Sequence, residues 1–184
     1  MTRCLTALAF VGALVLSGCA ATVSKPPAST DAQSSGPAMV APSVPTTRVA
    51  VLIQGAPGIQ TSNDWHTFRA EWRTAFEASA ASAGLAFAYF ESEPPTQPAG
   101  TTLVRITVKD YRYLTSGARY GFGILTGNAF IDASAEFVEL PSKRRLGAGQ
   151  YATSSSAWQG IFSAMTDKQV AALSNEIVQD IRRK

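Results

Sequence analysis

The pattern of apolar and polar positions divides the chain from residue 48 onwards into strands and helices. The segment RVAVLIQ at residues 48–54 is a continuous apolar run with regularly placed β-branched side chains, which is typical of a central strand buried on both faces. Beyond a short turn, large aromatic residues recur with helical spacing. They are Trp65, Phe68, Trp72 and Phe76. This spacing predicts a helix over 64–83, capped by Ser62 or Asn63 and followed by Gly84, with its aromatic stripe in the core.

Four more segments have strand-like patterns. They are LAFAYFE at 85–91, TTLVRITVKDYRYL at 101–114, NAFIDASAEFVEL at 128–140 and a weaker one, LGAGQYATSS at 146–155, which we expect at an edge. In the second of them, Val104, Ile106 and Val108 alternate with polar residues, which predicts one buried and one wet face. The expected buried side of the third consists of Ala129, Ile131, Ala133, Ala135 and Phe137.

The C-terminal segment DKQVAALSNEIVQDIRRK has helical periodicity. Its apolar stripe consists of Val170, Leu173, Ile177 and Ile181. Thr166 and Gln169 have the spacing of a capping box at its start. The order strand, helix, three or four strands, helix predicts an α+β two-layer sandwich. We expect a mostly antiparallel sheet of about five strands, with the two helices on one face.

The first 18 residues follow another pattern. Arg3 precedes an apolar run that ends at Leu16, and two small residues then lead to Cys19. The run is shorter than the roughly 20 residues of a membrane span and has the order of a secretory signal peptide. The stretch LSGC at 16–19 resembles the lipobox of bacterial lipoproteins. This resemblance implies cleavage before Cys19 and lipidation of its sulfur and new amino group; an ordinary signal peptide with an incidental cysteine is the alternative.

Residues 19–47 are rich in Ala, Ser, Pro and Thr and poor in large apolar side chains, so we expect a disordered tether after the lipidated Cys19. Residues 48–184 form the single domain. Ala20 stands where aspartate would favour inner-membrane retention in the enterobacterial sorting pattern. We therefore expect a protein anchored in the outer membrane, with its domain facing the periplasm. The only other cysteine, Cys4, would leave with the signal peptide, so no disulfide is expected.

Candidate chemistry is sparse. His66 is the only histidine, and Asp64 would lie on a different side of the helix, so the two form no natural acid–base pair. The serines at 154–156 have no assignable base, and too few ligands are present for zinc. The basic run at 143–145 lies between Pro141 and Gly147 and is interpreted as a solvated turn. We expect no enzymatic activity, no cofactor, no metal and no nucleic-acid partner.

A second resemblance involves the run VRITVKDYRYLTSGARYGFGILTGNAFIDASAEFVEL. Its strand, glycine-containing loop and strand resemble an uncharacterised family of Gram-negative envelope lipoproteins, with Gly121, Gly123 and Gly127 in the loop. The fold of that family is related to curli-secretion-type lipoproteins and to the TolB amino-terminal domain. By analogy, the resemblance implies a role in envelope assembly or scaffolding. The long insertions of the curli secretion pore are not evident here.

Two segments carry candidate interaction residues. The glycine loop contains Tyr120, Phe122 and Ile124, and a later segment contains Trp158 and Phe162. Exposed apolar side chains of this kind favour contact with a partner; the alternative for both groups is that they cover the domain's own sheet, which the pattern favours for Trp158 and Phe162. We expect an interaction or assembly module of the cell envelope, held at the membrane by its N-terminal lipid and bound to an envelope protein or to itself. The alternative is a small-ligand or glycan-binding domain that uses the wet face of the sheet or the aromatic residues around tyrosines 111, 113 and 120.

Overall fold

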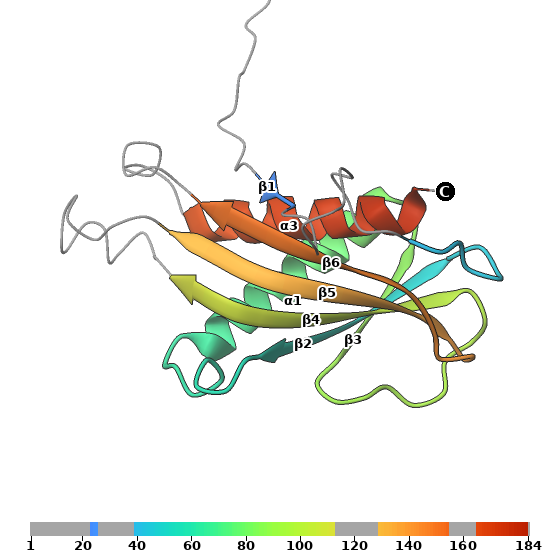
Figure 1. The fold of residues 1–184 in the computed structure, drawn as a ribbon, viewed down its shortest axis with the longest axis horizontal. Coiled ribbons are helices and arrows are strands. Elements are labelled where there is room, and N and C mark those ends of the chain that lie inside the picture. Colours follow the sequence, from blue (N-terminus) through green and yellow to red (C-terminus); the bar gives the residue numbers. More distant parts are fainter. Residues whose placement is uncertain (1–22, 26–38, 113–128, 155–164, 184) are drawn as a thin grey trace, which may run out of the picture.

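The computed structural model describes residues 23–25, 39–112, 129–154 and 165–183 of the 184-residue chain. These residues form one six-stranded sheet with the strand order β1-β6-β5-β4-β2-β3. Helices α1 (Trp65–Ser82) and α3 (Met165–Arg182) lie on one side of it (Figure 1). The expected α+β sandwich with two helices on one face is confirmed in this coarse form.

The sheet is mixed rather than mostly antiparallel. Strand β2 (Arg48–Gly55) lies between β3 (Ala86–Phe90) and β4 (Thr101–Arg112) and is parallel to both. Helix α1 returns the chain so that β3 runs beside β2 in the same direction, as in other βαβ units. The next connection, residues 91–100, is no tight turn. It carries the chain past β2, so β4 pairs with β2 rather than antiparallel with β3.

The other half of the sheet is antiparallel, as predicted. Strand β4 pairs with β5 (Phe130–Leu140), and β5 pairs with β6 (Arg144–Ser154) through a turn in which Lys143 has a φ of 58°. The side chains expected on the inner face of β5 are all buried. In the described part of the chain, β6 is followed in the sheet by the two-residue strand β1 (Val23–Ser24) alone, so β6 is close to the edge position that its weak pattern suggested.

Both predicted helical stripes lie in the core between the sheet and the helices. On α1 they are Trp65, Phe68, Trp72 and Phe76, and on α3 Val170, Leu173, Ile177 and Ile181; all are buried. Gly84 follows α1 with a φ of 71°, a left-handed conformation that suits glycine.

The predicted N-terminal cap of α1 is wrong. Asp64 occupies the cap position of α1 and makes no side-chain capping bond, because its carboxylate accepts a hydrogen bond from Tyr111 instead. At the other helix, Thr166 lies within α3, and the Gln169 side chain donates to the carbonyl of Ala129 at 3.0 Å. At α1 a contact with a distant strand residue thus replaces the local cap, and at α3 the Gln169 side chain contacts the residue before β5.

Residues 39–47 lie against the sheet rather than apart from it. The amide of Val40 donates to the Leu146 carbonyl in β6 at 2.7 Å. Further along, the amides of Thr47 and Arg48 both donate to the carbonyl of Gly100, at 2.8 and 3.1 Å. Together with Val23–Ser24, these contacts involve residues that precede the domain boundary predicted at residue 48. That boundary stays a prediction, but the described parts of the N-terminal segment pack on the domain.

Candidate functional site

The residues predicted to carry function are outside the described part of the chain. They are Cys19, Tyr120, Phe122, Ile124, Trp158 and Phe162. Their roles stay predictions. The polar clusters among the described residues are a different set, and the two largest fasten the N-terminal segment to the domain.

The first cluster is built on one face of α3. Glu176 and Asp180 are four residues apart and therefore neighbours on the helix surface. The Tyr151 hydroxyl, from β6, donates to Asp180 Oδ2 at 2.7 Å. Arg183 pairs with Asp180 at 2.8 Å and with Glu176 at 3.2 Å. The Asp180 side chain is only 2% exposed, so its charge has to be balanced by nearby donors.

Lys25 completes this cluster from the N-terminal segment. Its ammonium lies 2.5 Å from Glu176 Oε1 and 2.7 and 2.9 Å from the two carboxylate oxygens of Asp180. It also lies 5.5 Å from the centre of the Tyr151 ring, within the range of a cation–π contact. Its side chain is 10% exposed, and lysine is seldom so buried without an anionic partner. Strand β1 directly precedes Lys25 and pairs with Ala152 and Thr153, which positions the ammonium.

The charges in this cluster are paired, with two carboxylates facing two cations. Burial by itself would raise the pKa of Glu176, but the hydrogen bond and charge of Lys25, together with Arg183, lower it overall. Burial, and then the hydrogen bond to Asp180, raises the pKa of Tyr151 far above its ordinary value. The phenol therefore remains a donor to Asp180. With Lys25 and Arg183 against Glu176 and Asp180, the cluster has two positive and two negative charges.

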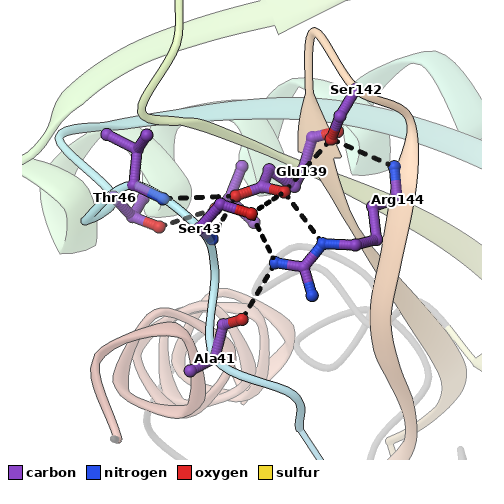
Figure 2. A network of polar contacts seen from close by, with 8 residues as sticks. Ala41, Ser43, Thr46, Glu139, Ser142 and Arg144 are labelled. Atoms are coloured by element: carbon purple, nitrogen blue, oxygen red, sulfur yellow. Dashed lines mark hydrogen bonds and ion pairs between the residues drawn. The ribbon is translucent and has the colours of Figure 1, made fainter.

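The second cluster centres on Glu139, near the turn between β5 and β6 (Figure 2). Its carboxylate accepts hydrogen bonds from the amide and hydroxyl of Ser43, from the Ser142 hydroxyl and from Arg144 Nε. Arg144 also donates to the carbonyl of Ala41 and the hydroxyl of Ser43, at 3.0 and 3.1 Å. Arg144, expected in a solvated turn, thus fixes residues 41–43 to the hairpin.

Glu139 is held as a carboxylate by these donors. The hydrogen bond from Arg144 contributes most to lowering its pKa; burial opposes this, and the bonds from Ser43 and Ser142 add to it. The resulting pKa is about 2, compared with an ordinary value of 4.5. The contact between the N-terminal segment and the β5–β6 hairpin therefore depends on an ionised Glu139.

Tyr111, one of the tyrosines suggested for ligand binding, takes part in the fold. Its ring stacks on Phe68, with centroids 4.2 Å apart and planes 5° from parallel. Its hydroxyl hydrogen-bonds Asp64 at 2.7 Å and Ser62 at 2.6 Å. Desolvation is the main reason that its pKa rises to about 12. Tyr113 and Tyr120 lie outside the described residues.

The described residues contain no group of three or more His, Cys, Asp and Glu side chains placed to hold a metal ion. His66 is exposed on α1. Among the described helices, neither has the length and apolar character needed to cross a bilayer.

Comparisons with known proteins give structural neighbours only. No family model and no curated protein matches the sequence. A PelC dodecamer structure from Paraburkholderia phytofirmans matches with a TM-score of 0.50 and 14% identity, over 89% of this chain and 98% of that one. A DUF330 protein from Xanthomonas campestris has a TM-score of 0.44 and 15% identity, over 74% and 84% of the two chains. A lipoprotein from Neisseria meningitidis has a TM-score of 0.36 and 12% identity, over 72% and 99%. At these identities the PelC likeness shows the fold alone.

Proposed function

We propose that this protein is a lipoprotein of the outer membrane, acylated on Cys19, whose domain faces the periplasm. The domain acts by binding rather than by catalysis, as an interaction or assembly module that associates with itself or with another envelope protein. The resemblances to curli-secretion-type lipoproteins and to the TolB amino-terminal domain remain predictions about its wider family.

One observation carries this function: residues 23–25, which begin four positions after Cys19, are bound by the domain. Val23 lies four residues after Cys19, pairs with Thr153 of β6, and is followed by Lys25 in the α3 cluster. The binding is specific, because it combines backbone pairing with a nearly buried ammonium. Such an arrangement suits a domain that is held at its N-terminus and has to be oriented with respect to the point of attachment.

Self-association is supported by the fold. PelC, which shares this fold over nearly its whole length, was crystallised as a dodecamer. We extend self-association to this chain as part of the proposal. The alternative, a glycan-binding domain, is less well supported, because the hydroxyl of Tyr111 is already engaged by Asp64 and Ser62.

The anchor is tested by Cys19→Ala. In cells fed a clickable palmitate analogue, the parent protein is expected to be labelled and to fractionate with the outer membrane. The variant is expected to lose the label and to remain as uncut precursor or appear in the soluble fraction. Palmitate incorporation that persists in Cys19→Ala would overturn the assignment of the anchor.

Self-association is tested by native mass spectrometry of the detergent-extracted protein, together with crosslinking in intact envelopes. The double variant Phe122→Ser and Ile124→Ser is compared with Val44→Ser, which changes an apolar side chain that is 44% exposed elsewhere. We expect crosslinks to be lost only in the double variant, at an unchanged melting temperature. A strictly monomeric parent without crosslinked partners would contradict the assembly role.

A further inference from the structure

We propose that the α3 cluster is a receptor site for the Lys25 ammonium and that this site sets the distance between the lipid anchor and the domain. When Lys25 is bound in this site, the domain is held close to the bilayer. When Lys25 is released, a longer segment of chain separates the domain from the lipid anchor. Because a lipid anchor is required for such a distance to exist, this inference rests on the function proposed above.

The site is built for a cation supplied by the chain itself. The Asp180 and Tyr151 side chains are at most 2% exposed, and Asp180 accepts from Tyr151 and Arg183 as well as from Lys25. Without Lys25, the cluster has one uncompensated negative charge beside a buried aspartate. An ammonium is the group that fits this position, since it donates to Glu176 and Asp180 simultaneously.

The backbone places the ammonium in register. Ser24 pairs with Ala152 and Val23 with Thr153, so Lys25 follows directly beside Tyr151, whose ring it approaches at 5.5 Å. A strand of two paired residues is too short to keep β1 on the sheet by its backbone hydrogen bonds alone. The ion pairs of Lys25 are therefore the main fastening of β1, and breaking them is expected to release Val23–Ser24 as well.

The change in reach follows from chain length. Lys25 is six residues after Cys19, so a docked Lys25 lies within about 20 Å of the lipidated residue. After release, the next contact of the described chain with the sheet is the Val40 amide on Leu146, 21 residues after Cys19. The maximum span then rises to about 75 Å, more than three times the docked value. One side chain thus determines whether the domain lies next to the membrane.

The test uses the full-length lipidated protein on a supported bilayer, with the water gap between bilayer and protein measured by neutron reflectometry. Lys25→Met keeps the length of the side chain but removes its charge, Lys25→Arg keeps the charge, and Lys168→Met on the exposed face of α3 is the matched control. We expect the gap to at least double in Lys25→Met and to stay unchanged in Lys25→Arg and Lys168→Met.

A second variant separates release from misfolding. In Lys25→Met, cysteines replacing Ser24 and Ala152, which face each other across β1 and β6, can form a disulfide that ties the strand down. Oxidation is expected to restore the narrow gap and reduction to widen it again, with unchanged circular dichroism. An unchanged gap in fully lipidated Lys25→Met overturns the receptor site alone. Absence of lipid from the parent protein, read from its intact mass, overturns the proposed function and the distance role together.

Discussion

Tyr151 and Asp180 are joined by a hydrogen bond of 2.7 Å between two side chains that are at most 2% exposed. The phenol comes from β6 and the carboxylate from α3, so the bond links the sheet to the last helix beneath the N-terminal segment. Asp180 is in turn contacted by both Lys25 and Arg183. Any change at this pair therefore affects both the core and the docking of the N-terminus.

We expect Tyr151→Phe to lower the free energy of unfolding by about 1.5–3 kcal/mol, because a hydrogen bond to a charged acceptor is lost while Asp180 stays buried. Urea denaturation followed by circular dichroism measures this. Tyr89→Phe is the matched control, since the Tyr89 hydroxyl is buried without a hydrogen-bond partner among the described residues, and its removal should be close to neutral. Equal effects of the two substitutions would contradict a stabilising role for the Tyr151–Asp180 bond.

Glu139 makes stability depend on pH in the acid range. Its pKa is lowered from 4.5 to about 2 in the folded protein, so ionised Glu139 stabilises the fold above about pH 4.5. This contribution is lost as the pH falls from about 4.5 to about 2. We expect the difference in urea midpoint between the parent and Glu139→Gln to be largest at pH 7 and to shrink towards pH 2.5. Glu77→Gln, at an exposed position of α1, is the control for the loss of a carboxylate. A difference in urea midpoint between the parent and Glu139→Gln that does not change with pH would contradict the prediction.

Trp72 is the centre of the aromatic stripe. It is fully buried. Its ring makes an edge contact with Phe68, with ring centroids 6.2 Å apart, and stacks on Phe76, with centroids 5.7 Å apart. We expect Trp72→Ala to cost about 3–5 kcal/mol through lost burial and the cavity left behind. His66→Ala, on the exposed face of the same helix, should change stability by no more than about 0.5 kcal/mol. A melting temperature within a degree or two of the parent in Trp72→Ala would mean that the core tolerates the cavity.

Two glycines allow steric and conformational costs to be separated. Gly84 and Gly100 both have positive φ, at 71° and 79°. A Cβ on Gly84 would meet nothing within 4 Å, whereas one on Gly100 would lie 3.1 Å from the Pro45 carbonyl oxygen and from Thr47 Oγ1. We expect Gly84→Ala to cost about 1–2 kcal/mol from backbone conformation alone and Gly100→Ala to cost clearly more. Thermal denaturation compares them; similar losses would show that residues 45–47 move aside readily.

The elements that were predicted correctly have strong local periodicity. The stripe from Trp65 to Phe76 and the alternation from Val104 to Val108 each determine which side is buried without reference to other segments. The mostly antiparallel pairing was predicted wrongly for β2, β3 and β4. Strands β2 and β3 are parallel because helix α1 connects them. Strand β4 pairs with β2 because of the path of the connection at residues 91–100, which no local pattern encodes.

The docking of Lys25 could not have been predicted from its neighbourhood. A single lysine in a segment rich in Ser, Pro and Ala is typical of a solvated linker, and its partners are 151 and 155 residues away. The residues that bind Lys25 do carry one indication of such a contact. Glu176 and Asp180 share one face of α3, Arg183 follows the helix end, and a buried aspartate there needs a cation from elsewhere. The sequence does not show which lysine supplies it.

The position of residues 23–25 and 39–41 beside β6 has a practical consequence for laboratory work on shortened proteins. An 11-residue strand with an unpaired side offers amides and carbonyls to any other strand that meets it, and edge-to-edge aggregation is the usual result. Ser24 covers this side near Ala152, and Val40 covers it near Leu146. A protein cut to begin at residue 48 would lose both covers at once. Oligomers formed by such a fragment would then reflect an exposed strand created by the cut.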